Sequence, residues 1–484
     1  MEQVQIKKIN ELHNKIYCEP WLAQELDDFF TFKTPNYKFD PRYKAGIWDG
    51  NIHLFSTKTR LLYGGLKFYV EKFCEERGYE IEYLSNFGQK EFSLVEANDF
   101  IDTLGIPERF EKRDYQIQTF AHAVRNSRAL LLSPTSSGKS FLIYLLLRYY
   151  QTTTLIVVPT ISLVLQLFSD FKSYGFDAEK YCQCSTDGDI ENVSKPIVIT
   201  TWQSIFKLPK KWFTNFNLAI GDEAHQFKAK SLITVMSNLD KCQYRFGFTG
   251  TLDGTHVNKL VLEGLFGPVK QVTTTSELIE QNYLSQFKIK CIVLQYGEEE
   301  RKLLFQSKYQ DEIDYIVQNK RRNNFIKNLA LSLNGNTLLL FQYVEKHGDI
   351  LYNLIQAKVG KDRNVYFVHG GVEGEEREDI RNLVEQESNS IIIASYGTFS
   401  TGVNIRNLHN IIFASPSKSR IRNLQSIGRG LRLGDNKESC TLFDIADDLQ
   451  YNRRKNHTLN HFVERIRIYN EEKFKLKIYT VDLQ

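Results

Sequence analysis

Leu130-Leu131-Leu132-Ser133-Pro134-Thr135-Ser136-Ser137-Gly138-Lys139-Ser140 joins an apolar run to a loop of small residues, and a second apolar run, Phe141 to Tyr150, follows directly. This order predicts a buried strand, a tight loop and a helix. Backbone N–H groups of such a loop and the positive end of the helix bind phosphate. The ammonium of Lys139 can reach the β- and γ-phosphates of a nucleotide, and the Ser140 hydroxyl can bind Mg²⁺.

The loop departs from the full phosphate-loop pattern, G-x-x-x-x-G-K-S/T, because Ser133 stands at the position of the first glycine. Gly138, Lys139 and Ser140 alone are also compatible with an exposed turn before a buried helix. The acidic half of a phosphate-hydrolysing site therefore has to be found elsewhere in the chain.

A second motif supplies that acidic half, because the apolar run 218–220 leads to Asp222-Glu223-Ala224-His225. Asp222 can hold the Mg²⁺ that bridges the phosphates, and Glu223 can orient or deprotonate the attacking water. As a lone tetrapeptide the motif is also compatible with a solvated helix start. Its position directly after an apolar strand favours the catalytic interpretation.

Composition limits the class of protein. The chain has 484 residues, 42% of them hydrophobic and 13% aromatic, which predicts a globular protein of two to four domains. Its net charge of +4 excludes a strongly basic protein, so any nucleic-acid site must be local. The seven cysteines are scattered and lack zinc spacing, which suits a reducing cytoplasm. Without a signal sequence or a long apolar segment, we expect a cytoplasmic protein and no membrane partner.

Residues 1–108 predict a small α+β domain, in which short β-like runs alternate with two helical stretches. Asp49-Gly50 predicts a two-residue hairpin turn between Ile47-Trp48 and Ile52-His53-Leu54. Four basic residues alternate with aromatic residues between Phe30 and Trp48; they are Lys33, Lys38, Arg42 and Lys44. This pattern can bind phosphates while the rings stack on bases, or it can belong to a half-buried amphipathic sheet.

From residue 109 the chain alternates apolar strand-like runs with helical runs, which is typical of parallel sheets covered by helices on both faces. The first series of strands is expected at 129–132, 154–158, 196–200, 217–220 and 244–248, and the second at 337–341, 365–368, 391–394, 410–413 and 440–445. We therefore predict two consecutive α/β domains, residues 109–285 and 286–450, with a hinge near residues 283–290. A helical tail, residues 451–484, is expected to dock on them.

The ordered motifs of the chain resemble those of superfamily 2 helicases. The matching stretches lie at 113–116, 133–140, 158–160, 200–204, 222–225, 248–251, 339–342, 368–371, 395–405 and 425–432. The resemblance implies two tandem RecA-like domains that bind ATP and Mg²⁺ and act on nucleic acid. The missing first glycine of the phosphate loop is tolerated in that superfamily.

The resemblance also implies a role for individual residues. The residues expected to bind the nucleotide are Arg113, Tyr115, Gln116, Thr135, Gly138, Lys139, Ser140, Asn404 and Gln425. Asn404 stands where many relatives have aspartate. Metal binding falls to Ser140 and Asp222, and catalysis to Lys139, Asp222, Glu223 and the candidate arginine fingers Arg429 and Arg432. The residues expected to contact nucleic acid are Pro159, Thr160, Thr201, Gln203, Gly370 and Thr398. In the N-terminal domain, the pattern of basic and aromatic residues makes Lys38, Arg42 and Lys44 further candidates for nucleic-acid contacts.

A closer resemblance covers essentially the whole chain. Residues 36–42, 48–50, 272–275, 462–466 and 472–474 resemble the UvsW-type recombination helicases of T-even phages. That resemblance implies an ATP-dependent DNA helicase that branch-migrates Holliday junctions, regresses stalled forks, unwinds D- and R-loops and reanneals strands. Its expected partners are branched, duplex and single-stranded DNA, with RNA in R-loops, and its expected state is a monomer or a transient oligomer.

Three alternatives remain open at this point. An RNA helicase would carry the same motifs, and the N-terminal resemblance is the reason to prefer DNA. The translocating subunit of a restriction enzyme is disfavoured because no carboxylate-plus-lysine pattern of a nuclease lies outside the two predicted α/β domains. A non-hydrolysing branched-DNA clamp is disfavoured because Lys139, Asp222, Glu223 and Arg429 are all present.

Overall fold

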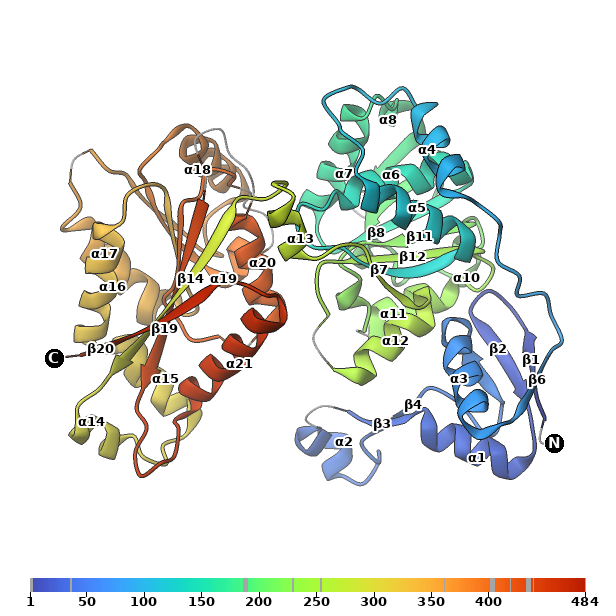
Figure 1. Ribbon diagram of the computed structural model, residues 1–484, viewed down its shortest axis with the longest axis horizontal. Helices are drawn as coiled ribbons and strands as arrows, with labels where there is room; N and C mark the ends of the chain where they lie inside the picture. Colours follow the sequence, from blue (N-terminus) through green and yellow to red (C-terminus); the bar gives the residue numbers. More distant parts are fainter. Residues whose placement is uncertain are drawn as a thin grey trace. The chain divides into compact units, whose positions relative to one another are not determined.

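The computed structural model describes residues 3–34, 37–185, 190–228, 230–252, 255–360, 362–400, 405–417, 419–431, 437 and 439–483. It consists of two compact units, Met1–Ser133 with Gly138–Thr273, and Pro134–Ser137 with Thr274–Gln484 (Figure 1). The N-terminal region therefore belongs to the same compact unit as the first α/β domain. The division after Thr273 places α13 (Thr275–Glu280) in the second unit, whereas the sequence assigned residues up to 285 to the first domain.

The N-terminal region is an α+β fold. Its sheet has the order β5-β2-β1-β6, formed by β1 (Gln3–Lys8), β2 (His13–Tyr17), β5 (Leu61–Tyr63) and β6 (Glu80–Tyr83). Helices α1 (Pro20–Phe29) and α3 (Lys67–Arg77) bury apolar side chains in one core with β1 and β2. That core continues into α12 (His256–Phe266), where Tyr69 donates a 2.7 Å hydrogen bond to Glu263.

A two-stranded ribbon carries a helical tip beside this sheet. β3 (Thr31–Lys33) pairs antiparallel with β4 (Asn51–His53), and η1 (Tyr37–Phe39) and α2 (Pro41–Lys44) lie between them. We call residues 31–53 the finger, and Figure 1 shows α2 at its end, apart from the four-stranded sheet. The hairpin predicted at Asp49-Gly50 is wrong, because the partner of β4 is β3. The side chain of Asp40 caps α2 and Pro41 begins it, so the chain turns as a helix instead.

The first α/β domain has a seven-stranded parallel sheet of order β13-β7-β12-β11-β8-β10-β9. Its strands are β7 (Arg128–Leu132), β8 (Thr154–Val158), β9 (Cys182–Ser185), β10 (Ile197–Thr201), β11 (Leu218–Gly221), β12 (Tyr244–Thr249) and β13 (Val269–Gln271). The five predicted strands are confirmed. The short strands β9 and β13 were not predicted, because neither is an apolar run.

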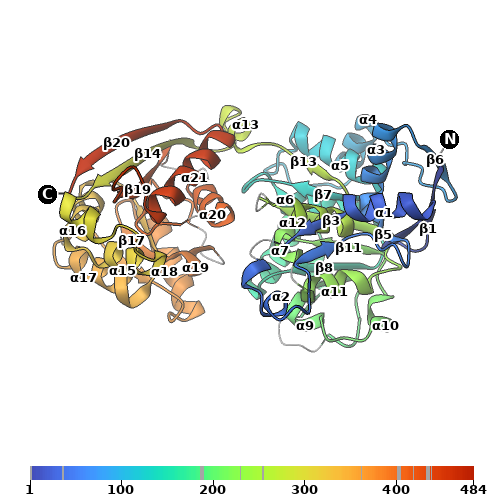
Figure 2. The same ribbon diagram turned by 90° about the horizontal axis from the view of Figure 1, so that it is seen from below.

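Helices cover both faces of that sheet, as Figure 2 shows. Side chains of α5 (Asp114–Asn126), α6 (Lys139–Tyr150) and α7 (Ile161–Ser173) pack on one face, and those of α11 (Lys230–Asn238) and α12 on the other. The shorter elements are α4 (Leu94–Asp102), α8 (Ala178–Tyr181), α9 (Trp202–Ile205), α10 (Lys210–Phe213) and η3 (Ala224–Lys228). Double coverage explains why the central strands β11 and β8 are buried along their whole length.

The second unit has a seven-stranded parallel sheet of order β16-β17-β15-β18-β19-β14-β20. Its strands are β14 (Gln286–Gln295), β15 (Thr337–Phe341), β16 (Val365–Val368), β17 (Ile391–Ser395), β18 (Asn410–Phe413), β19 (Ser439–Asp448) and β20 (Leu476–Asp482). Besides α13, its α-helices are α14 (Glu298–Leu303), α15 (Tyr309–Gln318), α16 (Lys320–Ser332), α17 (Asp349–Gln356), α18 (Gly374–Gln386), α19 (Tyr396–Ser400), α20 (Arg420–Gly430) and α21 (His457–Glu471).

Two strands of this sheet differ from the sequence predictions. Residues 286–290 were predicted as part of a hinge but form the start of β14. The tail was predicted as a docking helix, and α21 does pack on β19, but the chain then continues into β20 beside β14. β14 therefore lies between β19 and β20 and receives both partners from the last part of the chain.

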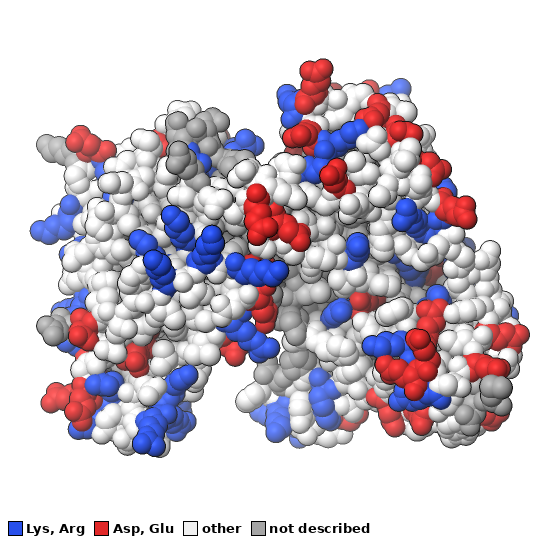
Figure 3. Space-filling model, viewed as in Figure 1, with Lys and Arg blue, Asp and Glu red and all other residues white. Residues whose placement is uncertain are grey.

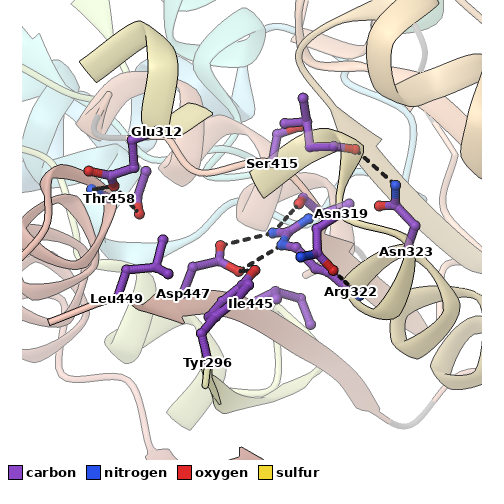
Figure 4. A network of polar contacts seen from close by, with 12 residues as sticks. Tyr296, Glu312, Asn319, Arg322, Asn323, Ser415, Ile445, Asp447, Leu449 and Thr458 are labelled. Carbon is purple, nitrogen blue, oxygen red and sulfur yellow. Dashed lines mark hydrogen bonds and ion pairs between the residues drawn. The ribbon is translucent and has the colours of Figure 1, made fainter. Parts of the chain in front are cut away.

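Buried ion pairs fix the helices of the second unit to its sheet. Arg322 of α16 donates to Asp447 of β19 at 2.7 and 3.1 Å, and Tyr296 donates to the same carboxylate at 2.9 Å (Figure 4). The side chains of Arg322 and Asp447 are completely buried. On α21, Arg465 forms an equivalent pair with Asp444 at 2.8 Å. No helix in the described ranges is long and apolar enough to cross a membrane.

Candidate functional site

The predicted phosphate loop joins the carboxyl end of β7 to the start of α6. Gly138 has a φ of +84°, a left-handed conformation that favours glycine, and it lies against the side chain of Gln116. Ser133 is fully buried, and its N–H donates to the carbonyl of Thr249 at 2.8 Å. Ser133 is not among the residues with positive φ, which explains why the missing first glycine is tolerated. Thr135 lies within the loop and is half-buried.

Three of the residues predicted to bind the nucleotide, Arg113, Tyr115 and Gln116, lie together at the start of α5. Gln116 is 3% exposed and accepts a 3.1 Å hydrogen bond from the N–H of Arg113. The guanidinium of Arg113 donates to the Tyr115 hydroxyl at 2.7 Å. Because Gln116 also lies against Gly138, this group is adjacent to the phosphate loop.

The acidic motif lies at the carboxyl end of β11, where it faces the loop lysine. Nζ of Lys139 is 2.9 Å from Oε1 of Glu223 and 3.8 Å from Oδ1 of Asp222. Asp222 also accepts the N–H of Glu223, whose backbone has a φ of +49°. The side chains of Asp222 and Glu223 are only 8% and 20% exposed, so the ammonium is shared between two largely buried carboxylates.

The pKa values of the two carboxylates shift in opposite directions. Burial raises the pKa of Asp222 above its ordinary value, the charge of Glu223 adds to that rise, and the opposing charge of Lys139 does not cancel it. Burial also acts to raise the pKa of Glu223. The charge of Lys139 and the hydrogen bond from His225 outweigh it, and the pKa of Glu223 stays below its ordinary value. Glu223 is therefore the ionised partner of Lys139 at neutral pH.

A hydrogen-bond chain connects this acidic motif to the loop after β12. Nδ1 of His225 lies 3.0 Å from Oγ1 of Thr249 and 3.4 Å from Glu223, and Thr249 donates to the carbonyl of Thr251 at 2.9 Å. Neither His225 nor Thr249 was among the predicted site residues, although both belong to motifs that the sequence shows. The contact gives the site a direct connection between the carboxylate and the strand next to β7.

Tyr174 is a further neighbour that the sequence did not predict. Its hydroxyl lies 2.9 Å from the hydroxyl of Ser140, the predicted metal ligand. Burial raises the pKa of Tyr174 to about 12, so it remains a neutral hydrogen-bond partner. No sequence signal identifies it, because the contact joins the end of α7 to the start of α6.

The donor set fits Mg²⁺. A hydroxyl and a carboxylate are the hard oxygen ligands that Mg²⁺ prefers, and it commonly takes only one or two of them from protein. The Lys139 ammonium beside Asp222 shows that the position accepts positive charge. In the described part of the chain, no group of three or more His, Cys, Asp or Glu residues is arranged to hold a metal ion.

The predicted nucleic-acid residues of the first domain share one edge of its sheet. Pro159 and Thr160 follow β8, and Thr201 and Gln203 lie at the end of β10 and on α9. β8 and β10 are adjacent and parallel, with Val158 opposite Thr201. Thr160 caps α7, and the Thr201 hydroxyl lies 3.1 Å from that of Ser204.

In the second unit the predicted residues also lie at adjacent strand ends. Gly370 follows β16 and is exposed, and Thr398 lies on α19 directly after β17. Thr398 is 6% exposed and its hydroxyl is 2.8 Å from that of Ser395. Asn404 and Arg432 lie outside the described residues. Gln425 and Arg429 belong to α20, whose backbone course is described but whose side chains at these positions are not.

The finger exposes most of its basic residues on a helical tip. Lys38, Arg42 and Lys44 are all exposed, and Arg42 also pairs with Asp40 at 2.9 Å and lies 5.0 Å from the Trp48 ring. Phe39 is 76% exposed. The alternative of a half-buried amphipathic sheet is therefore wrong for residues 37–44, which are helical.

Three family models match the chain. Residues 3–83 match the model described as DNA helicase UvsW, N-terminal. Residues 109–254 match that of the type III restriction enzyme, res subunit, and residues 320–434 that of the helicase conserved C-terminal domain. The ATP-dependent DNA helicase uvsW of Enterobacteria phage T4 is 35% identical over 97% of this chain and 98% of its own length. The chain belongs to the UvsW family of DNA helicases.

Other comparisons agree with membership of the UvsW family. The crystal structure of T4 UvsW matches over the full length of both chains, with 32% identity and a TM-score of 0.52. The DNA 3'-5' translocase XPB2 of Sulfurisphaera tokodaii is 28% identical over 45% of this chain and 48% of its own length. The DNA-bound type ISP restriction-modification enzyme LlaBIII shares the fold, with a TM-score of 0.55 and 16% identity over 84% of this chain and 34% of its own.

Proposed function

We propose that this UvsW-family helicase uses ATP hydrolysis to move on DNA and to remodel branched DNA, including Holliday junctions, stalled forks and D- and R-loops. One observation carries the proposal. Lys139 of the phosphate loop lies 2.9 Å from Glu223 and 3.8 Å from Asp222, which supports an NTP-hydrolysing site formed by these two motifs.

Several residues of the first domain have separate roles in ATP hydrolysis. The backbone at Gly138 and the start of α6 bind the phosphates, and Lys139 turns from the carboxylates to the β- and γ-phosphates. Ser140 and Asp222 would hold Mg²⁺, which when bound neutralises phosphate charge. Glu223, released from Lys139, orients or deprotonates the attacking water.

The hydrogen bond between His225 and Thr249 transmits the state of Glu223 to the strand beside the phosphate loop. Arg429 and Arg432 act as arginine fingers for the γ-phosphate, which would make hydrolysis depend on the second unit. Pro159, Thr160, Thr201 and Gln203 hold one stretch of nucleic-acid backbone, and Gly370 and Thr398 hold another. A cycle of hydrolysis then advances one set of contacts relative to the other.

We assign the binding of branched DNA to the finger. Lys38 and Lys44 are exposed beside Phe39, whose ring is free to stack on a base or a sugar. A helical tip on a two-stranded ribbon can reach nucleic acid away from the strand ends of the motor. The matched model of the UvsW N-terminal domain spans the whole finger, which supports a role specific to this family.

The test is a side-by-side measurement of ATP hydrolysis with single-stranded DNA, linear duplex, forked DNA, four-way junction and RNA. We expect forks and junctions to stimulate hydrolysis most. Equal or greater stimulation by RNA would favour an RNA helicase. A restriction-type translocase would be stimulated by linear duplex and not further by branches.

A further inference from the structure

Two adjacent strands of the second unit carry a group of four lysines. β14 and β20 run parallel, with Lys290 directly opposite Lys477 and Ile289 opposite Leu476. This register places Lys288 opposite Lys475, and the N–H of Ile289 donates to the Lys475 carbonyl at 3.0 Å. Because alternate residues of a strand share a face, all four side chains lie on the same face of the sheet. We call Lys288, Lys290, Lys475 and Lys477 the lysine quartet.

The quartet has no counter-charge within the described part of the chain. All four lysines are exposed, and no described acid forms an ion pair with any of them. The Phe443 ring lies 5.4 Å from the Lys290 ammonium. The single acid on this face of β14, β19 and β20 is Asp447, which is buried and paired with Arg322.

This arrangement is unfavourable for the sheet itself. Neighbouring strands lie about 4.8 Å apart and alternate residues about 6.6 Å apart, so four like charges occupy a small area. Like charges directly opposite one another destabilise a sheet. Figure 3 shows basic side chains gathered over the region where β14 and β19 are drawn in Figure 1, largely among uncharged residues.

Protection of a sheet edge explains only the two lysines at the start of β20, Lys475 and Lys477. Lysines are common on edge strands because they prevent edge-to-edge pairing, and β20 is an edge strand. β14 is an interior strand, with β19 on one side and β20 on the other. Lys288 and Lys290 therefore have no such role, and a ligand outside the chain accounts for them better.

We propose that the lysine quartet binds the phosphate backbone of a nucleic-acid segment. The ligand must be a polyanion with closely spaced charges, and this inference rests on the proposed function as a DNA helicase. Tyr479 lies on the same face, is 43% exposed and can pack against a sugar or a base. The quartet lies on the first half of β14 and at the start of β20, whereas Gly370 and Thr398 follow the carboxyl ends of their strands. It is therefore a second contact for DNA, separate from the motif residues.

The test compares two variants of the full chain with equal loss of charge. One replaces the quartet by glutamine, and a control replaces four exposed lysines elsewhere: Lys58, Lys207, Lys320 and Lys358. Binding to a fluorescent four-way junction is measured between 50 and 200 mM salt, a range over which roughly one unit of log–log slope is lost per phosphate contact. We expect the quartet variant to lose about two to four units of slope and at least roughly tenfold in affinity. The control should change little.

Thermal unfolding separates this effect from damage to the fold. Removing opposed like charges should leave the melting temperature of the quartet variant unchanged or higher, while its DNA affinity falls. A double variant, Lys290→Gln with Lys477→Gln, should show about half the loss of slope. If the full variant binds the junction like the control, the inference is wrong.

Two further measurements test for a lipid ligand and for a failure of the proposed function. Loss of binding to vesicles containing phosphatidylserine, with unchanged DNA binding, would assign the quartet to a lipid surface and overturn the inference. If the proposed function fails, the wild-type chain will show no DNA-stimulated ATP hydrolysis. If the wild type hydrolyses ATP and the quartet variant still matches the control, only the inference on the quartet fails.

Discussion

Replacing Asp447 by leucine should destabilise the second unit strongly. The carboxylate accepts two hydrogen bonds from Arg322 and one from Tyr296, and it is completely buried. Without it the guanidinium of Arg322 stays buried and uncompensated, and its Nη1 already has no partner in the described part of the chain. Breaking one side of such a pair costs about 3–5 kcal/mol. For a unit of this size, roughly 2–4 °C is lost per kcal/mol, so the melting temperature should fall by about 6–20 °C.

Removing the whole group should cost much less than removing Asp447 alone. Arg322→Met, Asp447→Leu and Tyr296→Phe together eliminate the charges and the hydroxyl, and apolar replacement of a buried ion pair is often close to neutral. One cost remains, because the carbonyl of Ala414 loses its 2.7 Å hydrogen bond from Arg322, worth about 1–3 kcal/mol. The triple variant should therefore lose about 1–3 kcal/mol, less than the loss of about 3–5 kcal/mol expected for Asp447→Leu.

Differential scanning calorimetry of the full chain measures both variants, and Asp311→Leu serves as a control for the same chemical change at an exposed position. The control should shift the melting temperature by no more than a degree or two. A single variant that behaves like the control, or a triple variant as unstable as the single one, would contradict this account of the buried pair.

Three further predictions concern function. Lys139→Ala should abolish ATP hydrolysis but leave DNA binding largely intact, and Glu223→Gln should bind ATP without turnover; wild-type rates in either purified variant would contradict the proposed site. Arg429→Ala should lose on the order of a thousandfold in turnover with unchanged nucleotide affinity, measured by titration beside the rate; a collapse of affinity with normal turnover would make Arg429 a binding residue instead. Reversing the charges of Lys38 and Lys44 should weaken junction binding and flatten its salt dependence by about two units of slope; an unchanged slope would exclude the finger as a DNA contact.

Several strands of the two α/β domains could be predicted because they are completely buried. β8, β10 and β15 are buried along their whole length, and such strands read as uninterrupted apolar runs. β14 and β20 have a polar face, so Phe287-Lys288-Ile289-Lys290 alternates and was predicted as a hinge. Alternation of this kind is expected where helices leave part of a parallel sheet uncovered.

Part of the candidate site could likewise be predicted from the sequence, and part could not. Lys139, Asp222 and Glu223 lie on loops that directly follow predicted strands, and parallel strands bring their carboxyl ends to one edge. The contact between Ser140 and Tyr174 could not be predicted, because it depends on how α7 ends against α6. The finger was also predicted wrongly, since Asp49-Gly50 is a strong hairpin signal and only the pairing of β3 with β4 shows that the chain turns earlier.

The position of β14 between β19 and β20 has a consequence for synthesis. β14 ends at residue 295, whereas β19 begins at residue 439 and β20 at residue 476. At a translation rate of about 5–20 residues per second, β14 is complete on the order of ten to forty seconds before both neighbouring strands have been synthesised. During that time its N–H and C=O groups and its apolar face are unprotected, and the second unit can complete its sheet only after β20 has left the ribosome. A polypeptide lacking β20 would leave one side of β14 permanently open, a state prone to aggregation.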